Sequence, residues 1–221
     1  MAPTEAEIKS LLSGDFTPEV VSKFEEYVTA QVAGQVAYHA DAVRRLVKLY
    51  QLYPTTCKAE ILAQACFLAL LQFPNHTDFL ALKYMIPVNT LNQDDTCDLI
   101  KTCFQQLESC QFTQFWESYA NLESSSSLKS YLTADKVKAF QGAILQVMSL
   151  TYKEVPASIV LPAVKLESTD AIKALGHPLV ESVSMDVVVF VATNENTKRQ
   201  RVYQASLDFD SISALMSKIA Q

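Results

Sequence analysis

The sequence predicts a mainly α-helical fold that ends in a smaller α+β part. Only 4 of the 221 residues are glycine, which disfavours a fold rich in tight hairpins. Apolar residues recur at intervals of three and four along the first 150 residues. β-Branched residues gather only later, in SVSMDVVVFVAT at 182–193. Because 49% of the residues are hydrophobic, the chain can bury a substantial core.

The densest apolar stretch, residues 46–86, predicts the middle of a stack of helices. A helix over 56–73 would be apolar around most of its circumference, so other elements must cover it on more than one side. Pro54 and Pro74 separate it from its neighbours, because proline lacks the N–H that a continuing helix needs. Short turns between helices are typical of a helical repeat array. The neighbours carry their own stripes, at Val43, Leu46, Val47 and Tyr50 and at Phe79, Leu82, Lys83 and Ile86.

Start signals place the other helices of this part. Thr4 and Glu7 form a capping box, T-x-x-E, for a first helix that ends near Gly14. Thr17 and Pro18 predict an N-cap followed by proline at the first helical position. The helices that follow are expected at about residues 18–34, 39–52, 96–108 and 112–122, with a loop at 87–95.

An aromatic cluster in QFTQFWESYANL follows one helix face. An aromatic cage or base-stacking platform would need exposed rings beside basic residues, and no lysine or arginine lies between Lys101 and Lys129. The spacing therefore favours packing between helices. The cluster consists of Phe112, Phe115, Trp116 and Tyr119.

The clearest change of composition is ESSSSLKS at 123–130, which predicts a domain boundary between residues 126 and 127. A long helix through 137–148 follows, and then a short helix that starts at proline in PASIVLPAVKL. Ser168 caps another short helix that Gly176 closes. A β-hairpin is expected at about 182–207, with its turn at 194–196 and a second strand at 201–207. A closing helix carries Ile212, Leu215, Met216 and Ile219.

This order of elements predicts two domains. Residues 1–126 would form a HEAT-like helical repeat domain, and residues 127–221 a winged-helix domain with a C-terminal helix. Helical repeats joined to a winged helix serve mainly in assembly.

Charge, cysteines and hydropathy restrict the function classes. The net charge of −6 gives no general attraction to nucleic acid or to an anionic membrane. No apolar run approaches the roughly 20 residues that span a bilayer, and the N-terminus lacks a signal-peptide layout, so we expect a cytoplasmic protein. Five cysteines without a C-x-x-C motif and three widely spaced histidines indicate core thiols and no metal or cofactor.

An enzyme is not expected. A Cys-His hydrolase needs a cysteine beside a histidine with a third orienting group, and His76 with Asp78 is the best candidate pair. The same segment, PNHTDF, is better explained as a helix start in which His76 or Thr77 is the cap and Asp78 complements the helix dipole.

Two candidate binding surfaces lie in the last forty residues. Lys198, Arg199 and Arg201 in the hairpin turn could touch an RNA backbone, or form a solvated turn or a protein contact. The helix at 168–175 begins with an acid and offers few basic groups to nucleic acid.

The second candidate surface is the hairpin edge together with the closing helix. The run VVVFV is more apolar than one small hairpin needs for its own core, so docking on neighbouring proteins is one interpretation. The other is that the domain's own helices cover both faces of the hairpin. The interface residues would be Val187, Val189, Val191, Val202, Ile212 and Met216.

Five segments in order resemble the family of k subunits of eukaryotic translation initiation factor three. They are KLYQLYP at 48–54, PNHTDFLALKYMI at 74–86, CQFTQFW at 110–116, LTYK at 150–153 and LDFDSISALM at 207–216. None is a catalytic signature, so the resemblance rests on packing residues.

The resemblance implies a scaffold subunit of the initiation-factor complex, without activity of its own. It further implies a chief partner in subunit l of that complex and an indirect link to the small ribosomal subunit. Two alternatives remain at this point: an equivalent scaffold subunit of the proteasome lid or the signalosome, which share this architecture, and a winged-helix module that binds RNA.

Overall fold

The structure is a computed structural model that describes residues 3–86, 95–124, 128–197 and 209–219. Seven helices in this description form the N-terminal part: α1 (Glu5–Leu12), α2 (Val21–Val32), α3 (Ala40–Leu52), α4 (Ala59–Leu70), α5 (Thr77–Met85), α7 (Asp95–Glu108) and α8 (Phe112–Ser124). Short 3-10 turns lie at Pro18–Val20, Pro54–Thr56 and Lys129–Tyr131.

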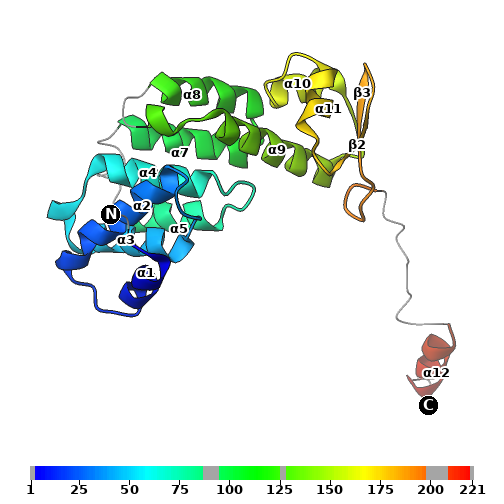
Figure 1. Ribbon diagram of the computed structural model, residues 1–221. Coiled ribbons are helices and arrows are strands. Elements are labelled where there is room, and N and C mark those ends of the chain that lie inside the picture. Colours follow the sequence, from blue (N-terminus) through cyan, green and yellow to red (C-terminus); the bar gives the residue numbers. More distant parts are fainter. Residues whose placement is uncertain (1–2, 87–94, 125–127, 198–208, 220–221) are drawn as a thin grey trace.

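The C-terminal part is smaller and contains the strands. It comprises α9 (Ala134–Thr151), β1 (Glu154–Pro156), α10 (Ala157–Ala163), α11 (Thr169–Leu175), β2 (Val180–Val183), β3 (Val187–Phe190) and α12 (Phe209–Ile219). Figure 1 shows α1–α5 at one end, α7 and α8 beside them, and α9 leading toward α10, α11 and the sheet. The prediction of a mainly helical protein with a small α+β part is confirmed.

Most of the predicted helix ends are confirmed by their hydrogen bonds. The Thr4 hydroxyl accepts from the Glu7 backbone N–H, and the Glu7 carboxylate accepts from the Thr4 N–H, which completes the capping box. Ser168 caps α11, and Gly176 ends it with a φ of 61°. Thr17 differs from the prediction: its side chain makes no cap bond, because the chain first forms the 3-10 turn at Pro18–Val20.

Helix α4 is the centre of the N-terminal part, as its composition predicts. All residues from Leu62 to Leu70 are buried. Helices α2, α5 and α7 pack against it, so it is covered on several sides. The helix is shorter than the predicted range 56–73, because Pro54–Thr56 form a separate turn and the chain turns again at Leu71 before Pro74.

The predicted bounds of the strands are wrong. Residues 182–193 do not form one strand, because Ser184 exchanges hydrogen bonds with Val187 and turns the chain between β2 and β3. In the described part of the chain, β3 is the central strand of an antiparallel sheet of order β1-β3-β2. The expectation that Val187–Val191 form a free edge is therefore wrong. The predicted second strand at 201–207, with Val202, lies outside the described residues.

A continuous hydrophobic core joins the two parts. The aromatic cluster of α8 is buried, and Phe115 and Tyr119 contact Phe140 of α9 with ring centroids 5.2 and 5.7 Å apart. The Trp116 indole N–H donates to the Ala163 carbonyl at the end of α10 over 2.8 Å. The Gln141 side-chain amide donates to the next carbonyl, that of Val164, over 3.0 Å. The boundary at 126/127 stays a prediction, but the core extends from α8 across α9 to α10.

We expect Trp116→Ala to lower the free energy of unfolding by about 3–5 kcal/mol, because a ring that is 4% exposed leaves a cavity and an unpaired Ala163 carbonyl. Trp116→Phe keeps much of the volume but loses the hydrogen bond, and should cost about 1–3 kcal/mol. Urea unfolding followed by circular dichroism measures both. The exposed neighbour Glu117→Ala is the control, and an unfolding curve for Trp116→Ala that overlays it would contradict the core assignment.

The C-terminal part should also lose stability in mild acid. Burial lowers the pKa of His177 below its usual 6.5, so the folded state favours the neutral ring. The neutral ring lies against Gly142 of α9 and accepts the Leu179 backbone N–H at Nδ1. This contribution is complete above pH 6.5 and is lost as pH falls through the lowered folded pKa. The unfolding free energy of His177→Asn should therefore fall less steeply between pH 7 and 5 than that of the unmodified chain; parallel pH curves would contradict this.

Candidate interaction surfaces

His76 and Asp78, the candidate pair for a hydrolase that the sequence does not favour, have separate partners. Asp78 accepts hydrogen bonds from the Tyr38 hydroxyl and the Arg44 guanidinium, which ties α5 to α3. The His76 ring instead lies between Phe73 and Phe104, with centroids 5.9 and 6.3 Å away. The predicted helix start is confirmed, with His76 at the N-cap position and Asp78 in the first turn of α5. The His76 side chain makes no cap bond, however; the Asn75 side chain accepts the Thr77 N–H in its place.

The cysteines lie mainly in the core. Cys66, Cys97 and Cys103 are buried, and burial raises the pKa of the Cys103 thiol to about 12. Cys110 is exposed in the turn before α8. Among the described residues, no three His, Cys, Asp or Glu side chains are grouped so that they could hold a metal ion. Nor does any helix in the described ranges have the length and apolar character to cross a membrane.

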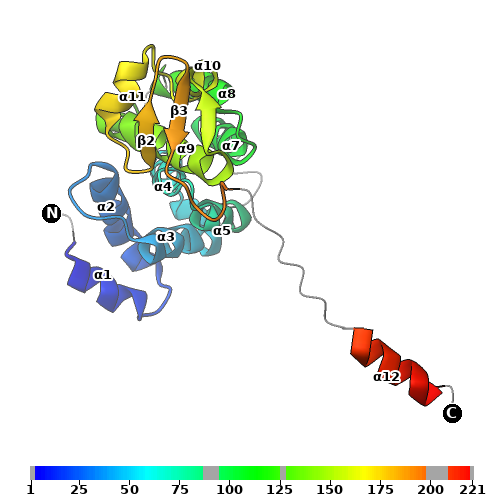
Figure 2. The same ribbon diagram turned by 90° about the vertical axis from the view of Figure 1, so that its right-hand side faces the viewer.

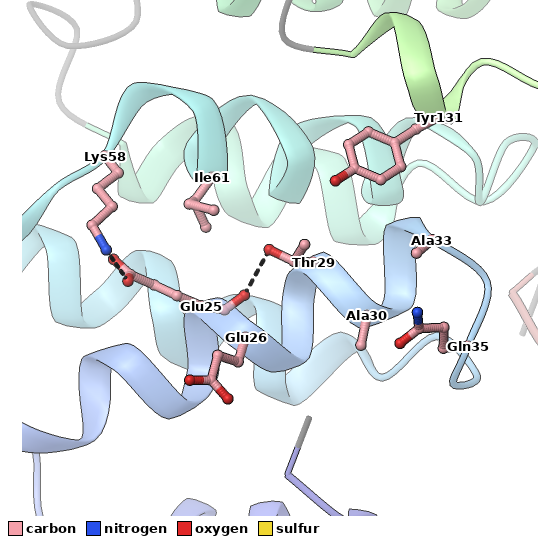
Figure 3. A pocket seen from close by; sticks show the side chains of 9 residues that line it. All are labelled: Glu25, Glu26, Thr29, Ala30, Ala33, Gln35, Lys58, Ile61 and Tyr131. Atoms are coloured by element: carbon pink, nitrogen blue, oxygen red, sulfur yellow. Dashed lines mark hydrogen bonds and ion pairs between the residues drawn. The ribbon is translucent and has the colours of Figure 1, made fainter. Parts of the chain in front are cut away.

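A polar hollow of about 510 Å³ lies between α2, α4 and the 3-10 turn at 129–131 (Figure 3). Its floor contains Glu25, which is 6% exposed and accepts from the Tyr50 hydroxyl at 2.7 Å and from Lys58 at 2.5 Å. Figure 3 shows the Lys58 amine reaching to the Glu25 carboxylate. Helical spacing does not identify this carboxylate as buried, because its partners lie 25 and 33 residues away. The arrangement connects α2, α3 and the start of α4, and we assign it a structural role.

An apolar groove of about 570 Å³ lies where α8, α9 and α10 meet. We call it the α9–α10 groove. Phe112 and Met148 are largely buried in it, whereas Tyr152 and Ile159 expose about half of their surface. The groove was not predicted, because it is formed by residues that are distant in sequence. Its principal residues are Cys110, Phe112, Met148, Tyr152, Ile159 and Pro162.

The valines of β3 divide between two faces of the sheet. Val188 is fully buried, with Phe190, against the core. Val187 and Val189 are half-buried, and Val191, just beyond the strand, is exposed. Because β1 and β2 occupy both edges of β3, any partner would meet these residues on the face of the sheet.

Helix α12 carries the most exposed apolar surface in the described chain. It stands away from the other elements in both views (Figures 1 and 2). We call its apolar side the α12 stripe. The stripe consists of Ile212, Leu215, Met216 and Ile219, which are 48% to 72% exposed.

The three basic residues of the predicted RNA contact lie outside the described residues. They are Lys198, Arg199 and Arg201. On α11, Lys173 forms an ion pair with Asp170 of the same helix at 3.2 Å, so its charge is partly compensated.

Comparison with known proteins decides the family. A model of the CSN8/PSMD8/EIF3K family matches residues 56–201, which is more than half of the chain. The chain belongs to the CSN8/PSMD8/EIF3K family. The matched region runs from the turn before α4 to beyond β3 and so includes the shared core.

Several relatives from distant eukaryotes carry the same name. The chain is 27% identical over 216 residues to the human protein named eukaryotic translation initiation factor 3 subunit K, covering 96% of this chain and 95% of that one. The Nematostella vectensis protein of the same name is 27% identical over 215 residues. The Dictyostelium discoideum protein of that name is 28% identical over 148 residues, which cover 67% of this chain and 57% of the relative. The predicted resemblance is therefore confirmed.

We expect Tyr50→Phe to destabilise the chain by about 1–3 kcal/mol, because it removes a donor from the buried Glu25 carboxylate. The measurement is the midpoint of urea unfolding. Tyr84→Phe is the matched control, since Tyr84 is 81% exposed. Equal midpoints for the two variants would mean that water replaces the Tyr50 hydroxyl without cost.

Proposed function

We propose that the chain is a non-catalytic scaffold subunit of eukaryotic translation initiation factor 3 and works in the cytoplasm. The observation that carries the proposal is the relatives' shared name over almost the whole chain. It binds neighbouring subunits, chiefly subunit l, and supports initiation through an indirect link to the small ribosomal subunit.

The features of the described chain that support a scaffold are its surfaces. Helix α12 presents four exposed apolar residues on one side, and an apolar stripe of this kind is suited to a groove or a helix bundle on another protein. Ile212 and Met216 are the interface residues of this helix. Val187, Val189 and Val191 form a second, weaker surface, because two of the three are half-buried in the sheet. Val202 is proposed for the same surface from its sequence alone.

Affinity purification of the tagged chain from a nuclease-treated cell lysate tests the assembly. We expect stoichiometric recovery of initiation-factor subunits, with RNA dispensable. Recovery of proteasome-lid or signalosome subunits in their place would overturn the assignment. Replacing Lys198, Arg199 and Arg201 with alanine should leave recovery unchanged. Recovery that requires both intact RNA and these three residues would favour the RNA-binding alternative.

Two matched double variants test whether α12 binds the neighbouring subunits. Ile212→Asp with Met216→Asp puts two charges on the α12 stripe and should reduce recovery of the neighbouring subunits at least about tenfold, since burying unpaired carboxylates is costly. Ser213→Asp with Ser217→Asp adds the same charge to exposed positions off the stripe and should recover them normally. Equal recovery by both would exclude α12 as an interface.

A further inference from the structure

The α9–α10 groove and the α12 stripe are two exposed apolar surfaces of the described chain. The groove is open, and its walls come from the turn before α8, the end of α9 and helix α10. Tyr152 and Ile159 stand at its rim with about half of their surface in solvent.

The route of the chain leads from the groove to α12. The Asn196 side-chain amide donates to the Ser149 carbonyl over 2.9 Å, so the described chain leaves beside the end of α9. Met148, Thr151 and Tyr152 on either side of Ser149 line the groove. Residues 198–208 separate this point from α12, and such a length can extend at most about 40 Å. The groove is therefore within reach of α12 on the same chain.

Helix α12 needs a packing partner to persist. It has 11 residues, and isolated helices shorter than about 12–15 residues are marginal in water. Its stripe is spaced i, i+3, i+4, i+7, so one narrow side carries the apolar residues.

In the arrangement of Figures 1 and 2, α12 stands clear of the groove. We propose that, in the free subunit, α12 docks into the α9–α10 groove of its own chain with its stripe against Met148, Tyr152 and Ile159. The inference rests on the proposed function in one respect: neighbouring subunits that bind the stripe must first displace it from the groove. The chain then hides its assembly surface until a partner is present.

The exposed thiol of Cys110 reports on the groove, because it lies at the groove's edge. The experiment uses the purified full chain carrying Cys57→Ser, since Cys57 is the other partly accessible thiol. Mass spectrometry follows the rate at which N-ethylmaleimide modifies Cys110. The stripe variant Leu215→Asp with Met216→Asp should react at least about fivefold faster than the parent, as expected for a site that is shielded most of the time. Ser213→Asp with Ser217→Asp should react at the parent rate.

Equal rates of Cys110 modification in all three proteins would overturn the proposal. Protection of Cys110 that weakens on dilution would also overturn it, because a second copy would then cover the groove. Because no partner subunit is present, this result is independent of the affinity purification. Cross-linking measures the proximity of α12 to the groove in a second way and leaves the stripe largely intact. A short bis-maleimide should link Met216→Cys to Cys110 within one chain far faster than it links Ser217→Cys. Equal linking rates would contradict docking through the stripe.

Discussion

The contact between the aromatic side of α8 and helix α9 holds this structure together. Phe115 and Tyr119 pack on Phe140, while Trp116 reaches past them to the backbone at the end of α10. Gln141, one residue after Phe140, bonds the adjacent carbonyl. One turn before Phe140 on α9, the Lys136 amine donates to the Val32 carbonyl of α2 over 2.7 Å. Helix α9 is thus fixed both to the helical stack and to the small α+β part.

Buried polar groups add further connections between the helices. Two buried carboxylates in the described residues connect helices: Glu25 joins α2 to α3 and α4, and Asp78 joins α5 to α3. Three apolar surfaces of the described chain remain available to other molecules. They are the α9–α10 groove, the outer valines of β3 and the α12 stripe. Because its parts share one core, the chain can hold the α9–α10 groove and the valines of β3 in fixed relation to each other, which suits a scaffold.

Much of the fold could be predicted because the signals for helices are local. The capping box at Thr4, the cap at Ser168 and the left-handed Gly176 each act within a few residues, and the stripe from Phe112 to Tyr119 shows burial by its spacing alone. The sheet was predicted poorly for the opposite reason. Strand β1 has three residues and pairs with β3 more than thirty residues later, so its strand character comes from that partner. The buried Glu25 and the groove depend on equally distant partners.

The central claim is that both parts share one core, and native-state hydrogen exchange of the full chain measures it most directly. Amides of α4 and α7 report on the helical stack, and amides of α9 and β3 report on the C-terminal part. If the core is shared, the most protected amides of both parts should open with the same free energy, and Trp116→Ala should lower both together. A C-terminal part that opens at much lower free energy, with the helical stack unaffected by the substitution, would show two independent domains and contradict the account.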